Sequence, residues 1–272
     1  MIIQRRKLSM VQYFIQLTSV KGALYLQPKH FFSGSQLKWI AIIAMFLDHT
    51  AKIISFRPYI TETVPYLIES NQLFELSQVF FPLFTLIGRL AFPIFCFLLV
   101  EGFVHTKNVK KYLLRLSLFA LISEVPYDLA FSHRVVDLES QNVFFTLVIG
   151  LMVIMGVKKF TFSSIQNGLF SLVFISGGLF LAEWFKTDYG GWIGILLIVI
   201  LYIFRSSSLL KCVLGGGVFL QNSWFGLFAF VPIYFYNGQR GKQWKYFFYW
   251  FYPVHLIVLF VIQQWLITPY LI

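Results

Sequence analysis

The chain has 272 residues, of which 58% are apolar, 20% are aromatic and only 12% are charged. An average soluble domain is roughly 45–50% apolar and about 25% charged, so this composition excludes an ordinary soluble enzyme, a disordered chain and a fibrous repeat. Basic residues outnumber acidic ones by 22 to 11, which gives a formal net charge of +11. In a chain of long apolar runs, the positive-inside rule for membrane proteins explains this excess better than nucleic-acid binding does.

Residues 1–36 form a basic segment that precedes the first long apolar run and that we expect on the cytoplasmic side of a membrane. The segment contains Arg5, Arg6 and Lys7 but no apolar core of the kind that a cleavable signal peptide carries. Within it, residues 7–20 mix basic and apolar side chains. Two interpretations stay open for this stretch: an amphipathic helix lying flat on the inner leaflet, or an unstructured basic tail.

The rest of the chain, residues 37–272, predicts an all-α transmembrane helical bundle of about nine spans, with no second domain. A helix needs about 20 predominantly apolar residues to cross the hydrocarbon core, and fewer when lysine or arginine flanks it. The predicted spans are 37–57, 79–104, 110–131, 143–157, 167–185, 190–204, 209–220, 223–237 and 246–267. The seventh contains three consecutive glycines at 215–217, which leaves open whether it crosses the membrane or is broken or re-entrant.

The segments between the predicted spans differ in their number of basic residues according to the side of the membrane on which they are expected. With a cytoplasmic N-terminus, the inner segments hold seventeen lysines and arginines and the outer segments hold four, namely Lys52, Arg57, Arg134 and Lys186. Basic residues concentrate in cytoplasmic loops. The alternation therefore predicts a multi-pass protein of the cell membrane with its N-terminus in the cytoplasm and its C-terminus outside.

Seven ionisable side chains lie inside the predicted spans, where a charged group costs roughly 2.5–3.5 kcal/mol at mid-helix and needs a partner or a function. They are Asp48, His49, Arg89, Glu101, Arg115, Glu124 and His255. At about 1.5 Å per helical residue, the two histidines and Glu124 fall in one layer near mid-membrane. Arg89 falls on the outer side of that layer, and Lys38, Glu101 and Arg115 fall nearer the cytoplasm. The simplest arrangement is a polar shaft with basic groups at its inner mouth.

Each of these residues also has a purely structural interpretation. The structural interpretation of His49 is a core histidine that is hydrogen-bonded to a carbonyl group. Asp48 points about 100° away from His49 on a helix, so it is expected to pair with Arg89 rather than to orient its neighbour. Arg89 stays charged in any surroundings, which makes it a functional candidate or one half of a structural salt bridge. Glu101 lies near the inner end of its span, where it has the option of snorkelling to the surface.

The sequence gives little support for a metal site. Cys96 and Cys212 both lie within apolar runs and lack the CxxC spacing of zinc sites, so we expect them to be core residues. The histidines are not part of an HExxH motif. No metal cofactor is therefore expected.

A histidine in a dry shaft with carboxylates within reach suits general-base chemistry on an amine or hydroxyl group that attacks an acyl group. A cationic inner mouth suits the phosphates of a cytoplasmic acyl-CoA. The same groups also suit a proton-coupled transporter or flippase, with His49 and Glu124 as a proton relay. A non-catalytic assembly factor for surface structures is the third interpretation. The enzymatic interpretation requires that the imidazole of His49 face a water-accessible cavity open toward cytoplasmic lysines and arginines.

Several sequence blocks, in order along the chain, resemble the TraX family of multi-pass membrane proteins. They are LKWIAIIAMFLDHTAKII (37–54), IGRLAFPIFCFLLVEGFVHTKNVKKYLLRLSLFALISEVPYDL (87–129), QNVFFTL (141–147), YNGQRG (236–241) and FYWFYPVHL (248–256). The family's namesake is linked to N-terminal acetylation of conjugative pilin. The family is also similar to the acyltransferase-3 membrane enzymes, which feature a basic residue followed, after ten others, by a catalytic histidine. Lys38 and His49 have that spacing, although lysine stands here where arginine is usual.

The resemblance, together with the estimated depths, implies an integral membrane acetyltransferase that uses acetyl-CoA as acyl donor. The acceptor is expected to be an extracytoplasmic peptide, glycan or lipid, with no nucleic-acid partner. His49 is the expected general base, assisted by Asp48 and Glu124, and Arg89 is expected to stabilise the oxyanion. The side chains expected to bind CoA or line the site are Lys38, Lys111, Arg115, Arg240, Glu101, Asn142 and His255.

Overall fold

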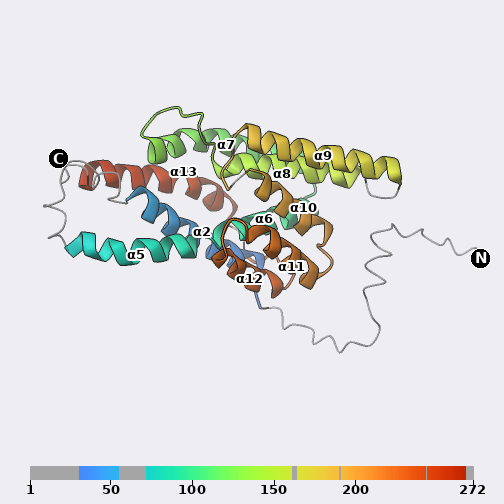
Figure 1. Ribbon diagram of the computed structural model, residues 1–272, viewed down its shortest axis with the longest axis horizontal. Coiled ribbons are helices and arrows are strands. Elements are labelled where there is room, and N and C mark those ends of the chain that lie inside the picture. Colours follow the sequence, from blue (N-terminus) through green and yellow to red (C-terminus); the bar gives the residue numbers. More distant parts are fainter. Residues whose placement is uncertain (1–30, 55–71, 161–163, 190, 243, 268–272) are drawn as a thin grey trace, which may run out of the picture.

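The computed structural model describes residues 31–54, 72–160, 164–189, 191–242 and 244–267, and Figure 1 shows them as an elongated bundle of helices. In chain order the helices are α2 (Gly34–Ile53), α5 (Gln72–Gly88), α6 (Ala91–His105), α7 (Val109–Ser132), α8 (Val143–Lys159), α9 (Ile165–Trp184), α10 (Trp192–Ile203), α11 (Ser208–Phe219), α12 (Phe230–Tyr234) and α13 (Lys245–Ile262). A 3₁₀ turn, η1 (Phe225–Ala229), precedes α12, and a π-helical turn, η2 (Gln263–Ile267), follows α13. The described residues contain no strand, only isolated bridges.

The predicted all-α architecture is confirmed, because helices occupy all nine segments that the sequence analysis assigns to spans. Nine complete spans are not confirmed. Among the residues that the structure describes, three helical stretches are long and apolar enough to cross a membrane: Val79–His105, Ile165–Trp184 and Tyr246–Trp265. The helices in the other segments are shorter or less apolar. The boundary expected at residue 36 falls inside α2, and the N-terminal stretch 7–20 lies outside the described residues.

Side-chain caps set where several of the helices begin. Ser33 caps α2 in a reciprocal capping box, in which Gln36 N–H bonds to the Ser33 hydroxyl and the Gln36 side chain accepts from the Ser33 backbone. Asn108, Asn142, Ser164 and Ser207 cap α7, α8, α9 and α11 through the same kind of bond. Each cap satisfies a backbone N–H group that the helix itself leaves free. The start of each helix is therefore fixed by local sequence.

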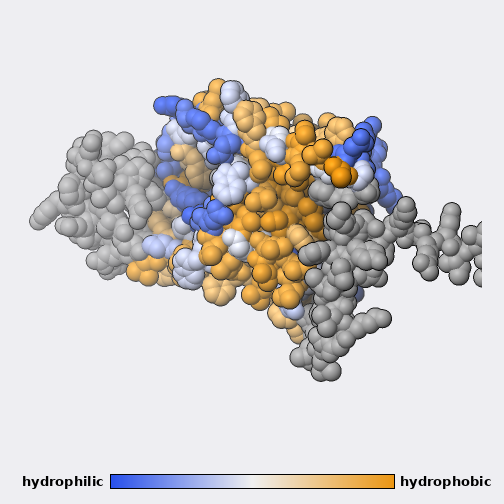
Figure 2. Space-filling model, turned by 45° about the vertical axis from the view of Figure 1, so that its right-hand side comes forward, coloured by the Kyte–Doolittle hydropathy of each residue, from blue (hydrophilic) through white to orange (hydrophobic). Residues whose placement is uncertain are grey.

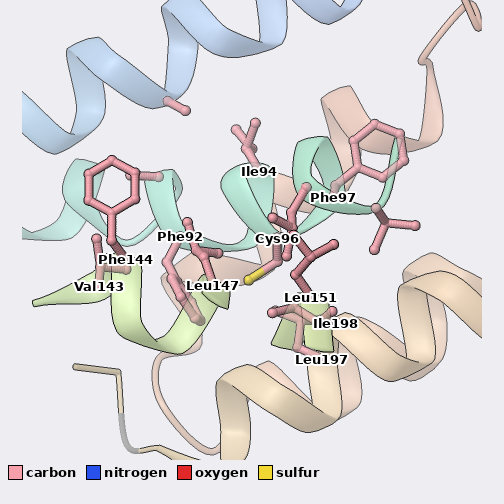
Figure 3. Packing of buried hydrophobic residues seen from close by; sticks show 14 of the residues in the cluster. Phe92, Ile94, Cys96, Phe97, Val143, Phe144, Leu147, Leu151, Leu197 and Ile198 are labelled. Carbon is pink, nitrogen blue, oxygen red and sulfur yellow. The ribbon is translucent and has the colours of Figure 1, made fainter. Parts of the chain in front are cut away.

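Helix α6 lies at the centre of the packing, with α2 on one side and α8 and α10 on another. Figure 3 shows Phe92 and Cys96 of α6 close to Leu147 and Leu151 of α8 and to Leu197 of α10. Cys96 is fully buried, as are Phe92, Leu151 and Leu197, so the interpretation of Cys96 as a core residue holds. Helix α6 is therefore the central element on which α2, α8 and α10 pack.

The second predicted span is interrupted where α5 ends and α6 begins. Arg89 and Leu90 form a turn in which Arg89 N–H bonds to Leu86 O and Leu90 N–H bonds to Ile87 O. The preceding residue, Gly88, lies against α2 so closely that a Cβ atom built there would stand 2.3 Å from the Cβ of Asp48. Arg89 therefore lies at a break between two helices rather than within one continuous span.

The glycine-rich segment forms a hairpin of short helices. Helix α11 runs without interruption through residues 215–217, so the helix is not broken at these glycines, which was one of the open alternatives. The chain turns between Leu220 and Trp224, and η1 and α12 lead back until Tyr236 forms a bridge with Phe32, just before α2. Gly226, in the first turn of the return, approaches the carbonyl oxygen of Arg89. The turn of the hairpin thus reaches the α5–α6 break.

The surface agrees with a membrane environment. Figure 2 shows an apolar band across one face of the molecule, with hydrophilic residues on either side of it. Helix α9 illustrates this exposure, because its outward side chains include Val173, Phe180 and Trp184, which are 66%, 63% and 72% exposed. Such contiguous apolar surface is unusual on a soluble monomer. A lipid-facing surface is the arrangement that this composition predicts.

Candidate functional site

A cavity of about 490 Å³ lies between α2, α6, α7, the start of α8, α13 and the segment that leads from α12 to α13. Four basic side chains from four different parts of the chain line it: Lys38, Lys107, Arg115 and Arg240. Two of these elements are joined by a backbone hydrogen bond, since Gly34 N–H at the start of α2 bonds to Gln239 O in the segment between α12 and α13. The cavity therefore brings together cationic groups that are far apart in sequence.

Aromatic side chains form much of the remaining wall. Tyr112, Tyr236, Phe248, Tyr249 and Tyr252 all line the cavity. The ammonium of Lys38 lies 5.1 Å from the centroid of the Phe248 ring, a distance at which cation and ring attract each other. The wall thus combines aromatic surface with a small number of charged groups, as small-molecule sites commonly do.

Glu101 is held by an ion pair rather than snorkelling to the surface. Its carboxylate accepts hydrogen bonds from Arg205 Nε at 2.8 Å and from Arg205 Nη2 at 3.3 Å. The imidazole of His105 lies 3.6 Å from the same carboxylate, and Glu101 is only 7% exposed. The pair ties the cavity wall on α6 to the segment between α10 and α11.

The two histidines that the depth estimate puts in one layer do meet. His49 Nδ1 lies 2.7 Å from His255 Nε2, and the two rings are parallel within 3°. Both side chains are buried, with 6% and 4% of their surface exposed. The rings of Phe131 and Tyr252 contact His49 edge-on, with centroids 5.5 and 5.9 Å away. The helices α2 and α13 thus contribute one histidine each to a buried pair.

Tyr252 separates this pair from the cavity. Its side chain lines the cavity and also contacts the rings of both His49 and His255, whereas neither histidine is part of the cavity wall. The sequence-based expectation that His49 itself faces the cavity is therefore corrected: one aromatic ring lies between them. The Tyr252 hydroxyl is buried and has no hydrogen-bond partner among the described residues.

Asp48 pairs with Lys52 and not with Arg89. The Lys52 Nζ to Asp48 Oδ2 distance is 2.5 Å, one helical turn apart on α2. Arg89 lies near Asp188, in the loop between α9 and α10, where desolvation raises the pKa of the Asp188 carboxyl and the Lys52 and Arg89 charges oppose that rise. These four charged residues do not line the cavity; they are called the outer charged cluster below because the topology predicted from the sequence puts them on the extracytoplasmic side.

Glu124 and Asn142 contact each other on α7 and at the start of α8. The Asn142 side chain donates to Glu124 Oε2 and to the carbonyl oxygen of Ala120, and the Asn142 backbone N–H also donates to Glu124. The second carboxylate oxygen of Glu124 is buried without a hydrogen-bond partner among the described residues. Neither Glu124 nor Asn142 lines the cavity, although Val143 and Phe144, which follow Asn142, do.

The structure sorts the residues expected at the site into separate groups. Of the expected donor-binding residues, four line the cavity: Lys38, Glu101, Arg115 and Arg240. Lys111 is exposed on the outside of α7 and is not part of the wall. His255 lies behind that wall, against His49. The four residues expected to act in catalysis stand outside the wall, in the histidine pair, the outer charged cluster and the Glu124–Asn142 contact.

Tyr252 and Arg205 are among the residues of this region that sequence reasoning missed. Tyr252 precedes His255 by three positions, a spacing that puts both side chains on one helix face, so its position was available from the sequence. Arg205 carries no such signal, because it follows α10 and reaches Glu101 only through tertiary packing. Among the described residues, no group of three or more histidine, cysteine, aspartate or glutamate side chains could hold a metal ion.

Comparisons with known proteins found a family model and a curated relative that match this chain. The family model described as TraX protein matches residues 33–263. The chain is 29% identical over 262 residues to the "Probable fimbrial assembly protein FimC, serogroup H1" of Dichelobacter nodosus, an alignment that covers 84% of this chain and 94% of that protein. No solved structure matches the chain significantly. Since the family model covers everything from the cap of α2 to the start of η2, the chain belongs to the TraX family.

Proposed function

We propose that this protein is an integral membrane acetyltransferase that moves an acetyl group from cytoplasmic acetyl-CoA to an amine or hydroxyl group of an extracytoplasmic acceptor. The proposal is carried by the cavity with the basic lining. One of its lining residues, Tyr252, contacts the buried His49–His255 pair. The cationic cavity, which could bind a polyanion, and His49, which could abstract a proton, thus both contact the side chain of Tyr252.

The volume and the lining of the cavity support the proposal that it binds an acyl-CoA. Its volume of about 490 Å³ lies within the range of roughly 300–1,000 Å³ that is usual for small-molecule sites. Lys38, Lys107, Arg115 and Arg240 would bind the phosphate groups, because charged hydrogen bonds to phosphate are the strongest polar contacts such side chains make. The aromatic wall would pack against the pantetheine arm, which leads the thioester toward Tyr252.

The reaction needs one base and one leaving group. A lone pair of the acceptor nitrogen or oxygen forms a bond to the acetyl carbonyl carbon, and the carbon–sulfur bond of the thioester breaks, so that the sulfur leaves with the bonding pair. His49 takes the proton of the acceptor and returns it to the CoA sulfur as general acid. The requirement that His49 face the cavity is not met in this structure, because His49 is not part of the cavity wall. The proposal therefore requires the Tyr252 ring, which lines the cavity and contacts the His49 ring, to move aside for this step.

The acceptor is proposed to arrive from the outer leaflet. The support for this is the N-terminus predicted to be cytoplasmic, since that orientation would put the basic cavity on the inner side and the outer charged cluster of Asp48, Lys52, Arg89 and Asp188 on the other. The relative from Dichelobacter nodosus carries a name that refers to fimbrial assembly, so a protein subunit of a surface fibre is the first acceptor to examine. A glycan or lipid-linked acceptor stays open.

The test measures donor binding and transfer separately in the full chain purified in detergent. We expect acetyl-CoA to bind, Arg115→Ala and Arg240→Ala to weaken that binding, and His49→Ala to abolish transfer with binding retained. Lys159→Ala is the matched control, because Lys159 is an exposed lysine at the end of α8 that does not line the cavity. Mass spectrometry of envelope proteins with and without the protein would identify the acetylated product. Failure of the wild-type chain to bind or hydrolyse acetyl-CoA, with His49→Ala behaving as wild type, contradicts the proposal.

A non-catalytic role in fibre assembly is the second candidate, and the name of the relative favours it. In that case, His49→Ala and Arg115→Ala would leave surface fibres unchanged, whereas changes on an exposed helix face would abolish them. Helix α9 offers such a face, since Leu169, Val173 and Phe180 are 58%, 66% and 63% exposed. Counting surface fibres in cells that carry each variant separates the two functions.

A further inference from the structure

We propose that His255 is a positioning residue that holds His49 in one tautomer, with the proton on Nδ1 and the lone pair on Nε2. The tautomer follows from the contacts of the resting protein alone. Its use in catalysis rests on the proposed function, in which His49 Nε2 is then the atom that accepts the proton.

The backbone of α13 fixes the first proton. His255 Nδ1 lies 2.7 Å from the carbonyl oxygen of Phe251. A carbonyl oxygen only accepts hydrogen bonds, so His255 Nδ1 carries the hydrogen. In a neutral imidazole one nitrogen donates and the other accepts, which makes His255 Nε2 an acceptor.

The pair contact fixes the second proton. His49 Nδ1 lies 2.7 Å from His255 Nε2, and since that nitrogen accepts, His49 Nδ1 must donate. His49 Nε2 is then the unprotonated nitrogen. Within the part of the chain that the structure describes, no hydrogen bond reaches Nε2 and no carboxylate forms a salt bridge with either ring. Burying an unpaired charge there is costly, so both rings are neutral at rest.

Aromatic packing holds the two rings in this register. Phe251 stacks on His255 with centroids 4.8 Å apart and planes within 12°, and Phe46 lies 6.3 Å from the same ring. On the other side, the edges of Phe131 and Tyr252 confine His49. Because neighbouring rings restrict both χ angles, the 2.7 Å contact is kept without a charged partner.

The arrangement gives His255 the direct orienting contact with His49 that Asp48, which points about 100° away on the same helix, was not expected to make. Asp48 bonds to Lys52 and so has its own partner. When His49 Nε2 takes a proton, the ring becomes an imidazolium whose Nδ1–H still bonds to His255 Nε2, while Phe251 O continues to hold His255 Nδ1–H. The positive charge is therefore stabilised by a chain of two hydrogen bonds that ends on a backbone carbonyl.

The direct test is the tautomer itself, read by nitrogen-15 solid-state NMR of the full chain in lipid bilayers with labelled histidine. The chain has five histidines, so His49→Gln and His255→Gln spectra assign the two signals. We expect both histidines to carry the proton on Nδ1 in the wild-type protein. His255→Phe should release His49 from this tautomer, while His255→Gln, whose side-chain oxygen can accept from His49 Nδ1, should keep it. His133→Asn is the matched control at an exposed histidine and should leave both signals unchanged.

A wild-type spectrum with the His49 proton on Nε2, or a His49 tautomer that is the same in His255→Phe, overturns the proposal. The wild-type spectrum needs no variant, so a misfolded His255→Phe protein does not remove the test. No donor or acceptor enters this measurement, so it stands apart from failure of the acetyltransferase. If transfer is found, His255→Phe should lower kcat by about 10²-fold or more with the KM for acetyl-CoA unchanged, and His255→Gln should restore part of it.

Discussion

Single residues in this bundle show that a buried ionisable group acquires its role from its partner. Glu101 and Arg205 bind each other across the sequence, Asp48 binds Lys52 within one helix, and His49 binds His255. Because an unpaired charge is costly in low-dielectric surroundings, removing one partner affects the other. The consequences are largest where both partners are withdrawn from water.

The Glu101–Arg205 ion pair is expected to stabilise the fold. Glu101→Ala leaves the guanidinium of Arg205 without its acceptor, and we expect it to lower stability by about 1–3 kcal/mol, less than for a fully buried pair because Arg205 keeps access to water. Thermal unfolding of the purified protein, followed by tryptophan fluorescence, measures this. Glu139→Ala is the control, because the Glu139–Lys186 pair is exposed, at 77% and 56%, and its loss should change the midpoint little.

Substitutions at Arg115 and Lys111 test whether lining the cavity is what allows a residue to bind the donor, because the sequence predicted donor binding for both. They lie one helical turn apart on α7, but only Arg115 lines the cavity. Arg115→Ala should weaken acetyl-CoA binding by roughly 10-fold, the loss of one charged hydrogen bond of about 1.5 kcal/mol. Isothermal titration of the detergent-solubilised protein measures the difference. An equal effect from Lys111→Ala would show that general electrostatic attraction, not the cavity, binds the donor.

At the scale of the helix, the close approach between α2 and the end of α5 is possible because Gly88 has no side chain. Gly88 packs on Asp48, and η1 reaches the same break through Gly226. Overpacking at such a point forces the neighbouring backbones apart and typically costs 1–3 kcal/mol. The α5–α6 break thus depends on small residues that no charge or hydropathy pattern reveals.

Gly88→Ala is therefore expected to destabilise the protein by about 1–3 kcal/mol. Gly177→Ala is the matched control, since a Cβ atom at Gly177 meets nothing within 4 Å. Alanine favours helix over glycine by roughly 0.5–1 kcal/mol, so the control should be neutral or slightly stabilising. Thermal unfolding midpoints of the two variants compare them directly. If Gly88→Ala proves as stable as Gly177→Ala, then α2 and α5 do not pack as described.

At the scale of the whole molecule, the arrangement of charges predicts how the bundle sits in a membrane. Figure 2 shows hydrophilic residues on either side of an apolar band. The α11–α12 hairpin starts and ends next to basic residues, Lys211 and Arg240. Since both of its flanks belong to the predicted cytoplasmic side, the hairpin is expected to enter the membrane and return.

Cysteine accessibility tests this orientation. In a chain with Cys96 and Cys212 replaced by serine, a membrane-impermeant maleimide added to intact cells should label Leu138→Cys and should not label Lys159→Cys. Leu138 is 78% exposed in the loop after α7, and Lys159 is exposed at the end of α8. The two positions lie on opposite sides in the predicted topology. Labelling of Lys159→Cys alone, or a C-terminal reporter active only in the cytoplasm, contradicts it.

The sequence by itself determined the location of the helices and the type of side chain available to the site. Helix formation depends on runs of apolar residues and on local caps such as Ser33 and Asn142, which are readable along the chain. Depth along a helix follows from its rise per residue, so His49 and His255 were correctly expected at one level. These are properties of single segments, and single segments suffice to predict them.

Only the tertiary structure decided which of these side chains meet. His49 and His255 are 206 residues apart, and Glu101 and Arg205 are 104 apart. Their contacts depend on how each helix is rotated and where it crosses its neighbours, which is set by packing around α6 and by close approaches such as Gly88 on Asp48. For the same reason, depth alone could not show that Arg89 lies at a helix break, that Lys111 faces outward, or that Tyr252 lies between the cavity and the histidine pair.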